Sequence, residues 1–225
     1  MQPTFDAAGS GGAGTSGNTL SWTHVLGNLT NPLILVGVCG EDFVSTSDPV
    51  VSSVTFNGIA MTRLGSVQGP AGSHIAEVEL WALWGSSVPV AGSYTVAVTF
   101  AGNTDSRKGG SASFGNVKQA TAEAIGSKAR NATTPLQATL TTLTNFALVF
   151  SVYGSQNGGT VTHDSDMTEV FAPTTSGEDC KLTGAYKIVP SASFVTVNES
   201  LTNPESEGMV IASFPYQSFG GGYFI

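Results

Sequence analysis

Charged side chains are scarce in this sequence. Asp, Glu, Lys and Arg make up 11% of the 225 residues, whereas roughly 25% is typical of soluble domains. The few charges are mostly acidic, and the formal net charge is −8. An acidic balance argues against nucleic acid as a partner, because phosphate binding requires a basic face. No segment approaches the roughly 18 apolar residues of a membrane-spanning helix, so we expect no membrane partner either.

Cysteine is also nearly absent. Cys39 and Cys180 are the only cysteines, and two residues so far apart do not make a disulfide framework. Pairing with each other is one interpretation; the one we favour is two buried thiols in a protein made in a reducing cytosol. The segment from Met1 to Asp6 has neither the basic nor the apolar region of a secretory signal.

The usual signatures of catalysis and of metal binding are missing as well. The sequence contains no Gly-x-Ser-x-Gly, His-Glu-x-x-His or paired-cysteine motif. It therefore predicts no catalytic residue, no metal and no cofactor. The best calcium candidate is His163-Asp164-Ser165-Asp166 with Glu169 nearby. This segment lacks the glycine and the distal glutamate of a calcium loop, and we interpret it as a solvated turn.

Isolated polar residues add little functional signal. Glu77 and Glu79 alternate along an expected strand and share a face, as the two carboxylates of a glycosidase can. Two solvent-facing glutamates are the simpler interpretation. His24 is expected to be structural or at the surface, and His74 is expected to be exposed in a loop.

What the sequence does contain is a regular pattern of short β-strands, with 28 glycines to serve turns. The clearest local signal is Asn57-Gly58 between two alternating segments. It predicts a type I′ hairpin, because both turn residues must accept positive φ. In that register Phe56 faces Ile59 across the hairpin.

Strands of this kind are expected along most of the chain. They lie near 20–25, 33–39, 54–56, 59–61, 77–84 and 94–100, and again near 136–142, 146–153, 167–172, 180–188, 193–199 and 208–215. Many short strands at roughly 8–12-residue spacing indicate an all-β fold, an antiparallel β-sandwich of jelly-roll-like type.

Composition divides the chain into three regions. Residues 1–18 are mostly Gly, Ala and Ser and predict a flexible N-terminal arm, 19–217 form the sandwich, and 218–225 form a C-terminal tail. Removal of residues 1–17 is therefore expected to leave the sandwich folded. Residues 116–129 are expected to link two halves of the sandwich.

Those halves form an internal pseudo-repeat. Segments match in the same order: 26–31 with 140–145, 33–38 with 147–152, 60–64 with 166–170, 88–89 with 189–190, 93–96 with 193–196 and 112–114 with 212–214. The matched residues are apolar and turn residues, so the repeated unit is a scaffold with halves near 19–117 and 132–217. One compact sandwich with a pseudo-twofold axis is favoured over two small sandwiches in tandem.

Basic residues are concentrated around the expected link. Five of the eight lie there: Arg107, Lys108, Lys118, Lys128 and Arg130. They form either a docking patch for an acidic partner or an ordinary solvated edge. Sheet edges are usually protected by lysine or proline, and lysine is scarce here. We therefore expect other subunits to cover the edges.

Several packing and turn segments together have a family likeness. They are Ser21-Trp22-Thr23-His24, Leu33–Val38, Val54–Thr62, Glu79–Leu83 and, after Pro89 and Gly92, Tyr94-Thr95-Val96. The series resembles a jelly-roll-type β-sandwich module of bacteriophage virion proteins and bacterial surface proteins, over about residues 19–215. Such motifs concern packing, so the resemblance carries over no catalytic residue.

The resemblance implies an accessory virion protein, most simply a capsid decoration (cement) protein made in the host cytoplasm. Its partners would be the major capsid protein or other virion subunits, and the protein itself would be a homo-oligomer, a dimer or a trimer. Contacts are expected through the sandwich edges and terminal arms. The expected partner-binding residues are Phe5, Arg107, Lys108, Tyr223 and Phe224.

The alternative is a carbohydrate- or receptor-binding module of a phage fibre or a bacterial surface protein. Such sites place aromatic rings on an exposed face for stacking on sugars. Trp22, Trp81 and Trp84 are the candidates. Trp81 and Trp84 have opposite parity along one expected strand, so at least one of them should face outward.

Overall fold

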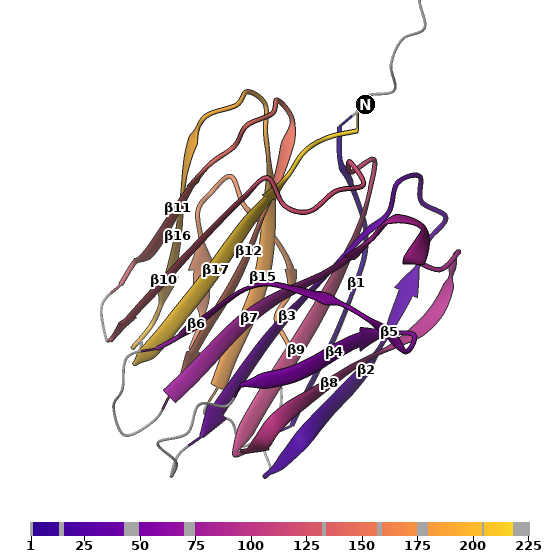
Figure 1. Cartoon of the computed structure of the whole chain (residues 1–225). Helices are drawn as coiled ribbons and strands as arrows, with labels where there is room; N and C mark the ends of the chain where they lie inside the picture. Colours follow the sequence, from indigo (N-terminus) through magenta and orange to yellow (C-terminus); the bar gives the residue numbers. More distant parts are fainter. Residues whose placement is uncertain are drawn as a thin grey trace, which may run out of the picture.

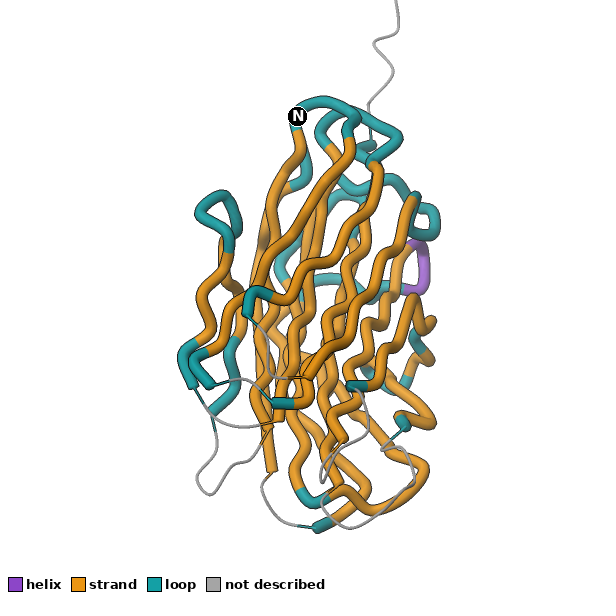
Figure 2. Tube along the Cα trace, turned by 90° about the vertical axis from the view of Figure 1, so that its left-hand side faces the viewer, coloured by secondary structure: helices purple, strands orange, loops and turns teal. Residues whose placement is uncertain are grey.

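The computed structural model describes residues 2–13, 16–42, 50–69, 75–131, 134–156, 159–174, 180–203 and 205–217. Within them the protein is an all-β antiparallel sandwich, as predicted, and most strands run along one long axis (Figure 2). The one helical element of this part of the chain is the 3₁₀ turn Gly85–Ser87. No described helix is suited to spanning a membrane.

The first half of the chain forms two sheets. Sheet I has the strand order β2-β8-β4-β5, and sheet II has the order β1-β9-β3-β7-β6. The strands of sheet I are β2 (Gly17–Leu26), β4 (Val51–Phe56), β5 (Ile59–Ala60) and β8 (Gly92–Thr104). Those of sheet II are β1 (Thr4–Ala13), β3 (Leu33–Asp42), β6 (Thr62–Gln68), β7 (Ile75–Trp84) and β9 (Ser106–Gly115).

The second half forms two further sheets. Sheet III has the strand order β10-β17-β12-β15-β14, and sheet IV has the order β11-β16-β13. The strands of sheet III are β10 (Ala124–Asn131), β12 (Ala147–Gln156), β14 (Thr168–Phe171), β15 (Cys180–Val189) and β17 (Ser206–Phe214). Those of sheet IV are β11 (Leu136–Thr141), β13 (Val161–His163) and β16 (Phe194–Leu201).

The four sheets stack as layers in the order I, II, III, IV (Figure 1). Each of the three spaces between them holds its own apolar core. Phe56 belongs to the core between I and II, and Tyr153 to the core between III and IV. Phe114 and Phe150 meet between II and III, with ring centroids 6.0 Å apart. Each half is therefore a sandwich with a core of its own. Sheets I and II form the first sandwich, sheets III and IV form the second, and a third core joins the two.

The two halves have the same strand order. Strands β1, β9, β3, β7 and β6 of sheet II correspond in position to β10, β17, β12, β15 and β14 of sheet III. In each half the first strand pairs with the last, the second with the next to last, and the third with the third from last. Because β6 packs on β10 and β1 on β14, an approximate twofold axis along the strands relates the halves.

The hairpin at Asn57-Gly58 is confirmed. Asn57 has φ 52° and Gly58 has φ 73°, which is the pair of positive values that a type I′ turn requires. Phe56 pairs with Ile59 across it, and Phe56 is fully buried. Local turn chemistry therefore set this register, as the sequence indicates.

The predicted flexible arm is wrong for residues 4–13. They form β1, which pairs with β9 and packs against β2. A Cβ atom on Gly9 would lie 2.5 Å from the carbonyl oxygen of Thr23, and one on Gly11 would lie 3.1 Å from Cβ of Trp22. The glycines of this segment therefore permit close approach of two backbones rather than flexibility.

The boundaries of the halves change accordingly. Residues 124–129 of the expected link belong to β10, which extends to Asn131 and is the counterpart of β1. The first half thus begins at β1 rather than at residue 19, and the second begins at β10 rather than at residue 132. The tail at 218–225 lies outside the described residues.

Candidate functional site

Exposed apolar side chains gather at one end of the molecule. Among the described residues, the large hydrophobic side chains left exposed are Phe5, Val25, Val90, Ile125, Leu143, Phe146 and Phe194. All but Ile125 lie near a strand terminus or in a loop at the end where β3 and β12 begin, which is uppermost in Figure 2. Ile125 lies further along the strands, level with Phe150 of β12. We call the other six residues the apolar end. Both halves of the chain contribute to it.

Two shallow hollows lie at this end. The one in the first half is lined mainly by Leu26, Leu29, Pro32, Val88, Pro89 and Val90. The one in the second half includes Ile188, Val189, Pro190, Phe194 and Val195. Val88-Pro89 follows β7, and Val189-Pro190 stands at the end of the corresponding strand β15, so the hollows occupy related places in the two halves.

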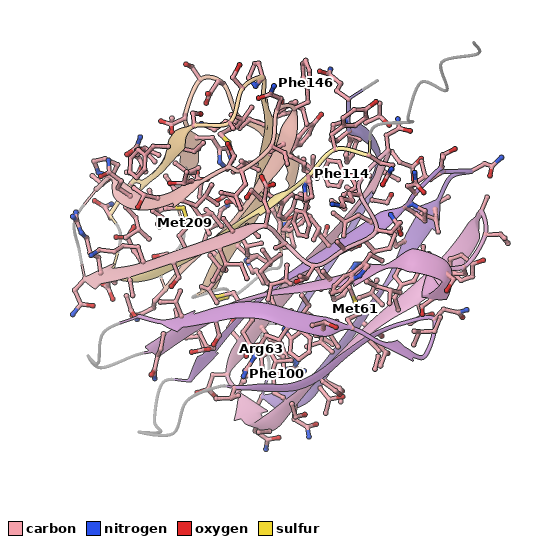
Figure 3. The ribbon with its side chains drawn as sticks, turned by 45° about the horizontal axis from the view of Figure 1, so that its top comes forward. Met61, Arg63, Phe100, Phe114, Phe146 and Met209 are labelled. Carbon is pink, nitrogen blue, oxygen red and sulfur yellow. The ribbon has the colours of Figure 1, made fainter. Side chains whose placement is uncertain are left out.

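Phe146 is held at the apolar end by an unfavourable backbone conformation. Its φ is 57° and 43% of the residue is exposed, and Figure 3 shows it at the periphery, whereas Phe114 lies between layers. The corresponding residue of the first half, Asn31, also has positive φ, 50°. Asparagine tolerates this region, whereas for a bulky residue it is an outlier that costs roughly 1–3 kcal/mol. The second half therefore keeps an exposed aromatic ring at a cost in stability.

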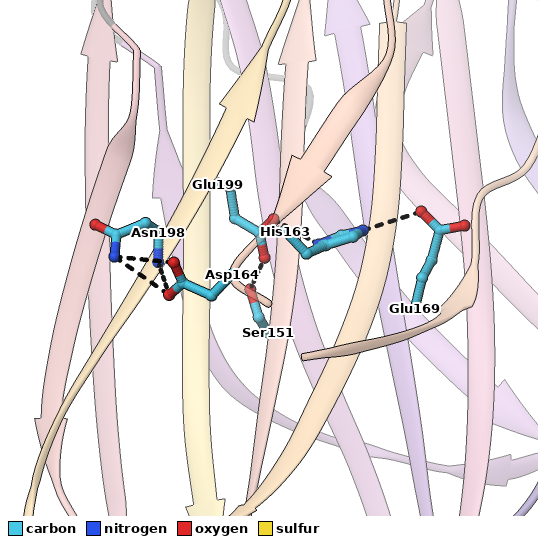
Figure 4. A network of polar contacts seen from close by, with 6 residues as sticks. All are labelled: Ser151, His163, Asp164, Glu169, Asn198 and Glu199. Carbon is cyan, nitrogen blue, oxygen red and sulfur yellow. Dashed lines mark hydrogen bonds and ion pairs between the residues drawn. The ribbon is translucent and has the colours of Figure 1, made fainter. Parts of the chain in front are cut away.

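A polar cluster crosses the second sandwich between sheets III and IV (Figure 4). His163 of β13 places Nε2 2.9 Å from Oε2 of Glu169 and Nδ1 2.5 Å from Oε2 of Glu199. Ser151 of β12 donates its hydroxyl hydrogen to Glu199 Oε1 at 3.1 Å. One histidine thus connects side chains from both sheets.

The charge state of this cluster follows from its partners. Burial lowers the pKa of His163, but hydrogen bonds and charges of Glu199 and Glu169 outweigh it and raise the pKa to about 9. Burial raises the pKa of Glu199. At neutral pH the ring of His163 is therefore protonated on both nitrogens, with Glu199 on one side and Glu169 on the other. Both ring nitrogens face glutamate side chains, so the arrangement is an ion-pair network. The described residues contain no group of three or more His, Cys, Asp or Glu side chains that could hold a metal ion.

The carboxylates of the candidate calcium segment are bonded within the protein. Asp164 accepts hydrogen bonds from the backbone N–H of Asn198 at 2.9 Å and from its side-chain amide at 3.2 Å. Asp166 pairs with Lys187 at 3.1 Å. The expected turn into the strand is present, closed by the bond from Met167 N to Asp164 O. It braces strands, however, rather than standing free in solvent.

His24 is structural and fully buried in the first sandwich. Its Nε2 lies 3.0 Å from the hydroxyl of Ser113, and that hydroxyl donates to Asp6 at 2.7 Å. Its Nδ1 lies 2.9 Å from the hydroxyl of Ser111, and that hydroxyl also accepts a hydrogen bond from Trp22 Nε1. A neutral ring with its proton on Nε2 satisfies this chain of bonds. Burial lowers the pKa of His24 to about 4. The serine lies between histidine and aspartate, which is not the order of a catalytic triad.

Glu77 and Glu79 are buried, so the expectation of solvent-facing glutamates is wrong. Glu79 Oε1 accepts from Val51 N, and its Oε2 accepts from Trp81 Nε1, both at 2.9 Å. Arg63 lies 3.8 Å away at the rim. Burial raises the pKa of Glu79. Both residues belong to β7, whose sheet is covered on both faces.

The predicted partner-binding residues are not brought together. Phe5 is 40% exposed at the apolar end, with its ring stacked on Tyr186 at a centroid distance of 5.9 Å. Arg107 and Lys108 are buried, and Arg107 Nε donates to Thr19 O at 2.7 Å. These two are therefore not part of a docking patch. Tyr223 and Phe224 lie outside the described residues, as does His74.

The predicted tryptophan platform is wrong as well. Trp22 and Trp81 are 7% and 8% exposed and belong to the core between sheets I and II. Trp84 is partly buried against the core between sheets II and III. Trp81 and Trp84 do face opposite sides of β7, but a further layer covers each side. Trp22 and Trp81 therefore offer no ring for sugar stacking, and Trp84 is only partly exposed.

The two cysteines are free and buried, which confirms the prediction of two buried thiols over that of a disulfide. Cys180 Sγ lies 4.0 Å from the carbonyl oxygen of Cys39 across the space between sheets II and III. Hydrogen bonding to Cys180 and burial raise the pKa of Cys39. These thiols are therefore unreactive packing residues.

Of the apolar end, only Phe5 is among the residues that the sequence predicts for partner binding. One available signal was the position of Leu143 between two expected strands, of Phe146 at the first residue of the second of them, and of Val90 after Pro89. No protein-family model matches this chain, and no curated protein matches it. Its function is therefore argued from its own residues.

Proposed function

We propose that this protein is a structural virion protein, a bacteriophage capsid decoration protein that stands end-on on the assembled shell. The observation that carries the proposal is the gathering of exposed large hydrophobic side chains at one end. Apolar surface concentrated in this way marks a site of protein association. In this proposal the apolar end meets the shell, and the four-layer body braces it.

The strained aromatic residue supports this use of the apolar end. Phe146 has positive φ and an exposed ring, where the first half has a tolerant asparagine. A cost in folding stability at an exposed position is understandable if the side chain is needed for binding. Phe194, 68% exposed, lies at the start of β16 at the same end.

The polar clusters support a binding rather than a catalytic role. Both described histidines are occupied by internal partners: His24 by serines and His163 by glutamates. Neither has the geometry of a base that activates a nucleophile. The buried polar groups thus connect layers of the body.

A cosedimentation experiment tests the proposal. Shells of the phage that encodes the chain, assembled without it, are mixed with purified protein and sedimented. We expect the protein to sediment with the shells, and Phe194→Asp to weaken binding at least tenfold, which is about 1.4 kcal/mol. Phe146→Asn, which installs the first-half residue, is expected to weaken binding while raising the free energy of unfolding by about 1 kcal/mol.

Thr162→Asp is the matched control, because Thr162 of β13 is exposed and pairs with Ser200, six residues or about 20 Å along β16 from Phe194. It is expected to bind as the parent does. No sedimentation of the parent protein with these shells would reject a decoration role. Equal weakening by Thr162→Asp and Phe194→Asp would reject the apolar end as the docking surface.

A further inference from the structure

The second sandwich carries opposite charges on its two edges. On β10, one edge strand of sheet III, Lys128 and Arg130 are exposed. At the opposite edge, β14 and the turn before it carry Asp166 and Glu169, whose side chains are 64% and 44% exposed. The two edges are separated by the whole width of the sheet, with β17, β12 and β15 between them.

The charges lie at nearly the same height along the strands. Strand pairing through β17 places Lys128 level with Tyr153 of β12. Pairing through β15 places Glu169 level with Ser151 of the same strand. Two residues along a strand correspond to about 7 Å, which long side chains can span. Copies set side by side with little axial shift would therefore bring opposite charges together.

The charges are not a property shared by both halves. In β1, the counterpart of β10, Gly11 and Ala13 occupy the places of Lys128 and Arg130. Of these two described counterpart strands, β10 alone thus carries the two cations. At the other edge of the second sandwich, Asp166 and Glu169 are paired within the chain, with Lys187 and His163, but their side chains stay 64% and 44% exposed and can accept a second cation. Strands β10 and β14 each have one hydrogen-bonded neighbour in sheet III, and unpaired edge strands are natural places for association.

We propose that the partner of these edges is a second copy of this chain, with the basic edge of one copy against the acidic edge of the next. The argument is charge complementarity: the chain has a net charge of −8, so copies repel unless opposite charges meet locally. Because two different surfaces meet, the contact is heterologous and repeats into rows or rings. This contact does not depend on the proposed function, since the purified chain alone is sufficient to form it.

The contact is weak and salt-dependent. Exposed ion pairs contribute about 0.2–1 kcal/mol each, and salt at 0.15 M screens charges beyond about 8 Å. Few copies associate in dilute solution at physiological salt. Copies held side by side on a surface would do so readily, because their effective concentration is high.

Zero-length carbodiimide crosslinking tests the contact. An equal mixture of ¹⁴N- and ¹⁵N-labelled protein at low ionic strength is expected to give mixed-isotope crosslinks from Lys128 to Asp166 or Glu169. We expect these crosslinks to fall at least fivefold in 0.5 M NaCl and to disappear with Lys128→Gln. Lys128→Glu should also reduce self-association in sedimentation velocity, whereas Lys118→Glu should not. Lys118 is an exposed lysine off this edge, and its substitution changes the net charge equally.

Charge exchange completes the test. One double variant, Lys128→Glu with Arg130→Glu, has acidic groups on both edges. The other, Asp166→Lys with Thr168→Lys, has basic groups on both edges and leaves Glu169 paired with His163. Each variant alone is expected to remain monomeric, and their mixture is expected to associate. Circular dichroism verifies that both are folded; a variant that fails to fold is replaced by its single substitution. Absence of mixed-isotope crosslinks in the parent protein, or equal loss with Lys118→Glu and Lys128→Glu, would overturn the proposal.

Discussion

At the scale of single residues, several glycines make room for large side chains between layers. Phe171 of β14 is 5% exposed. A Cβ atom on Gly110 of β9 or on Gly184 of β15 would collide with its ring, and one on Gly37 of β3 would lie 3.1 Å from it. Glycine-rich composition here therefore reflects close packing of sheets II and III rather than turns alone.

The two described histidines are expected to give stability opposite dependences on pH. Because the pKa of His163 is about 9 against an ordinary 6.5, the folded protein holds a proton that the unfolded chain releases between these values. Its stabilisation is complete below pH 6.5 and is lost as pH rises through 9. The pKa of His24 is about 4, so its contribution is complete above pH 6.5 and is lost as pH falls towards 4.

Urea unfolding from pH 4 to 10 measures both contributions. His163→Gln is expected to be roughly 3 kcal/mol less stable at pH 7, because Glu199 loses its buried partner, and to show a flatter alkaline side. His24→Gln should flatten the acid side between pH 4 and 6.5 instead. If each variant retains the slopes of the parent protein, the proton binding assigned to these residues is incorrect.

At the scale of elements, β1 changes most between sequence and structure. It pairs with β9 along its length and covers Trp22 and His24 of β2. The earlier expectation that the sandwich stays folded without residues 1–17 is therefore replaced by its opposite. We expect deletion of residues 2–13 to lower the urea midpoint markedly and to shift tryptophan fluorescence to the red.

A point substitution separates strand docking from chain length. Gly9→Val should have a similar but smaller effect, because its side chain would collide with the backbone of β2 at Thr23. Ala8→Val, at the neighbouring position of the same strand, is the matched control. A deletion variant with the parent's midpoint and fluorescence would show that β1 contributes no stability.

The register of the repeat shows what sequence matching cannot resolve. Matching residues 33–38 with 147–152 pairs Leu33 with Ala147, whereas strand pairing places Leu33 and Leu148 in equivalent positions opposite Phe114 and Phe214. A one-residue slip moves every side chain to the other face. Strands buried on both faces lack the alternation that would reveal such a slip. That the halves arose by duplication stays a prediction.

At the scale of the whole molecule, the halves are expected to depend on each other. The core between sheets II and III contains side chains of both halves, among them Leu35 and Phe114 from the first and Phe150 and Phe214 from the second. Each half alone would expose this apolar face to water. Burial of one such side chain contributes about 1.5–3 kcal/mol, so the loss of a whole interface exceeds the stability of an ordinary domain.

Separate expression of residues 1–120 and 121–225 tests this dependence. We expect each fragment alone to aggregate or to bind a hydrophobic dye, and the two together to assemble into a complex with the fluorescence of the intact chain. The intact chain should unfold in one transition by fluorescence and by circular dichroism. Two stable monomeric fragments, or two separate transitions, would contradict a shared core.

By itself the sequence determined the strand content, the antiparallel class, the turn at Asn57-Gly58 and the parity of Trp81 and Trp84. These are local properties, since strand alternation and turn chemistry depend on neighbouring residues. Only the tertiary structure decided which faces are covered. It buried Trp22 and Trp81 and packed Trp84 against a core. It also made Gly9 and Gly11 part of a strand and left Phe146 and Phe194 exposed. Coverage of a face depends on what packs over it, and in this protein that is a sheet distant in sequence.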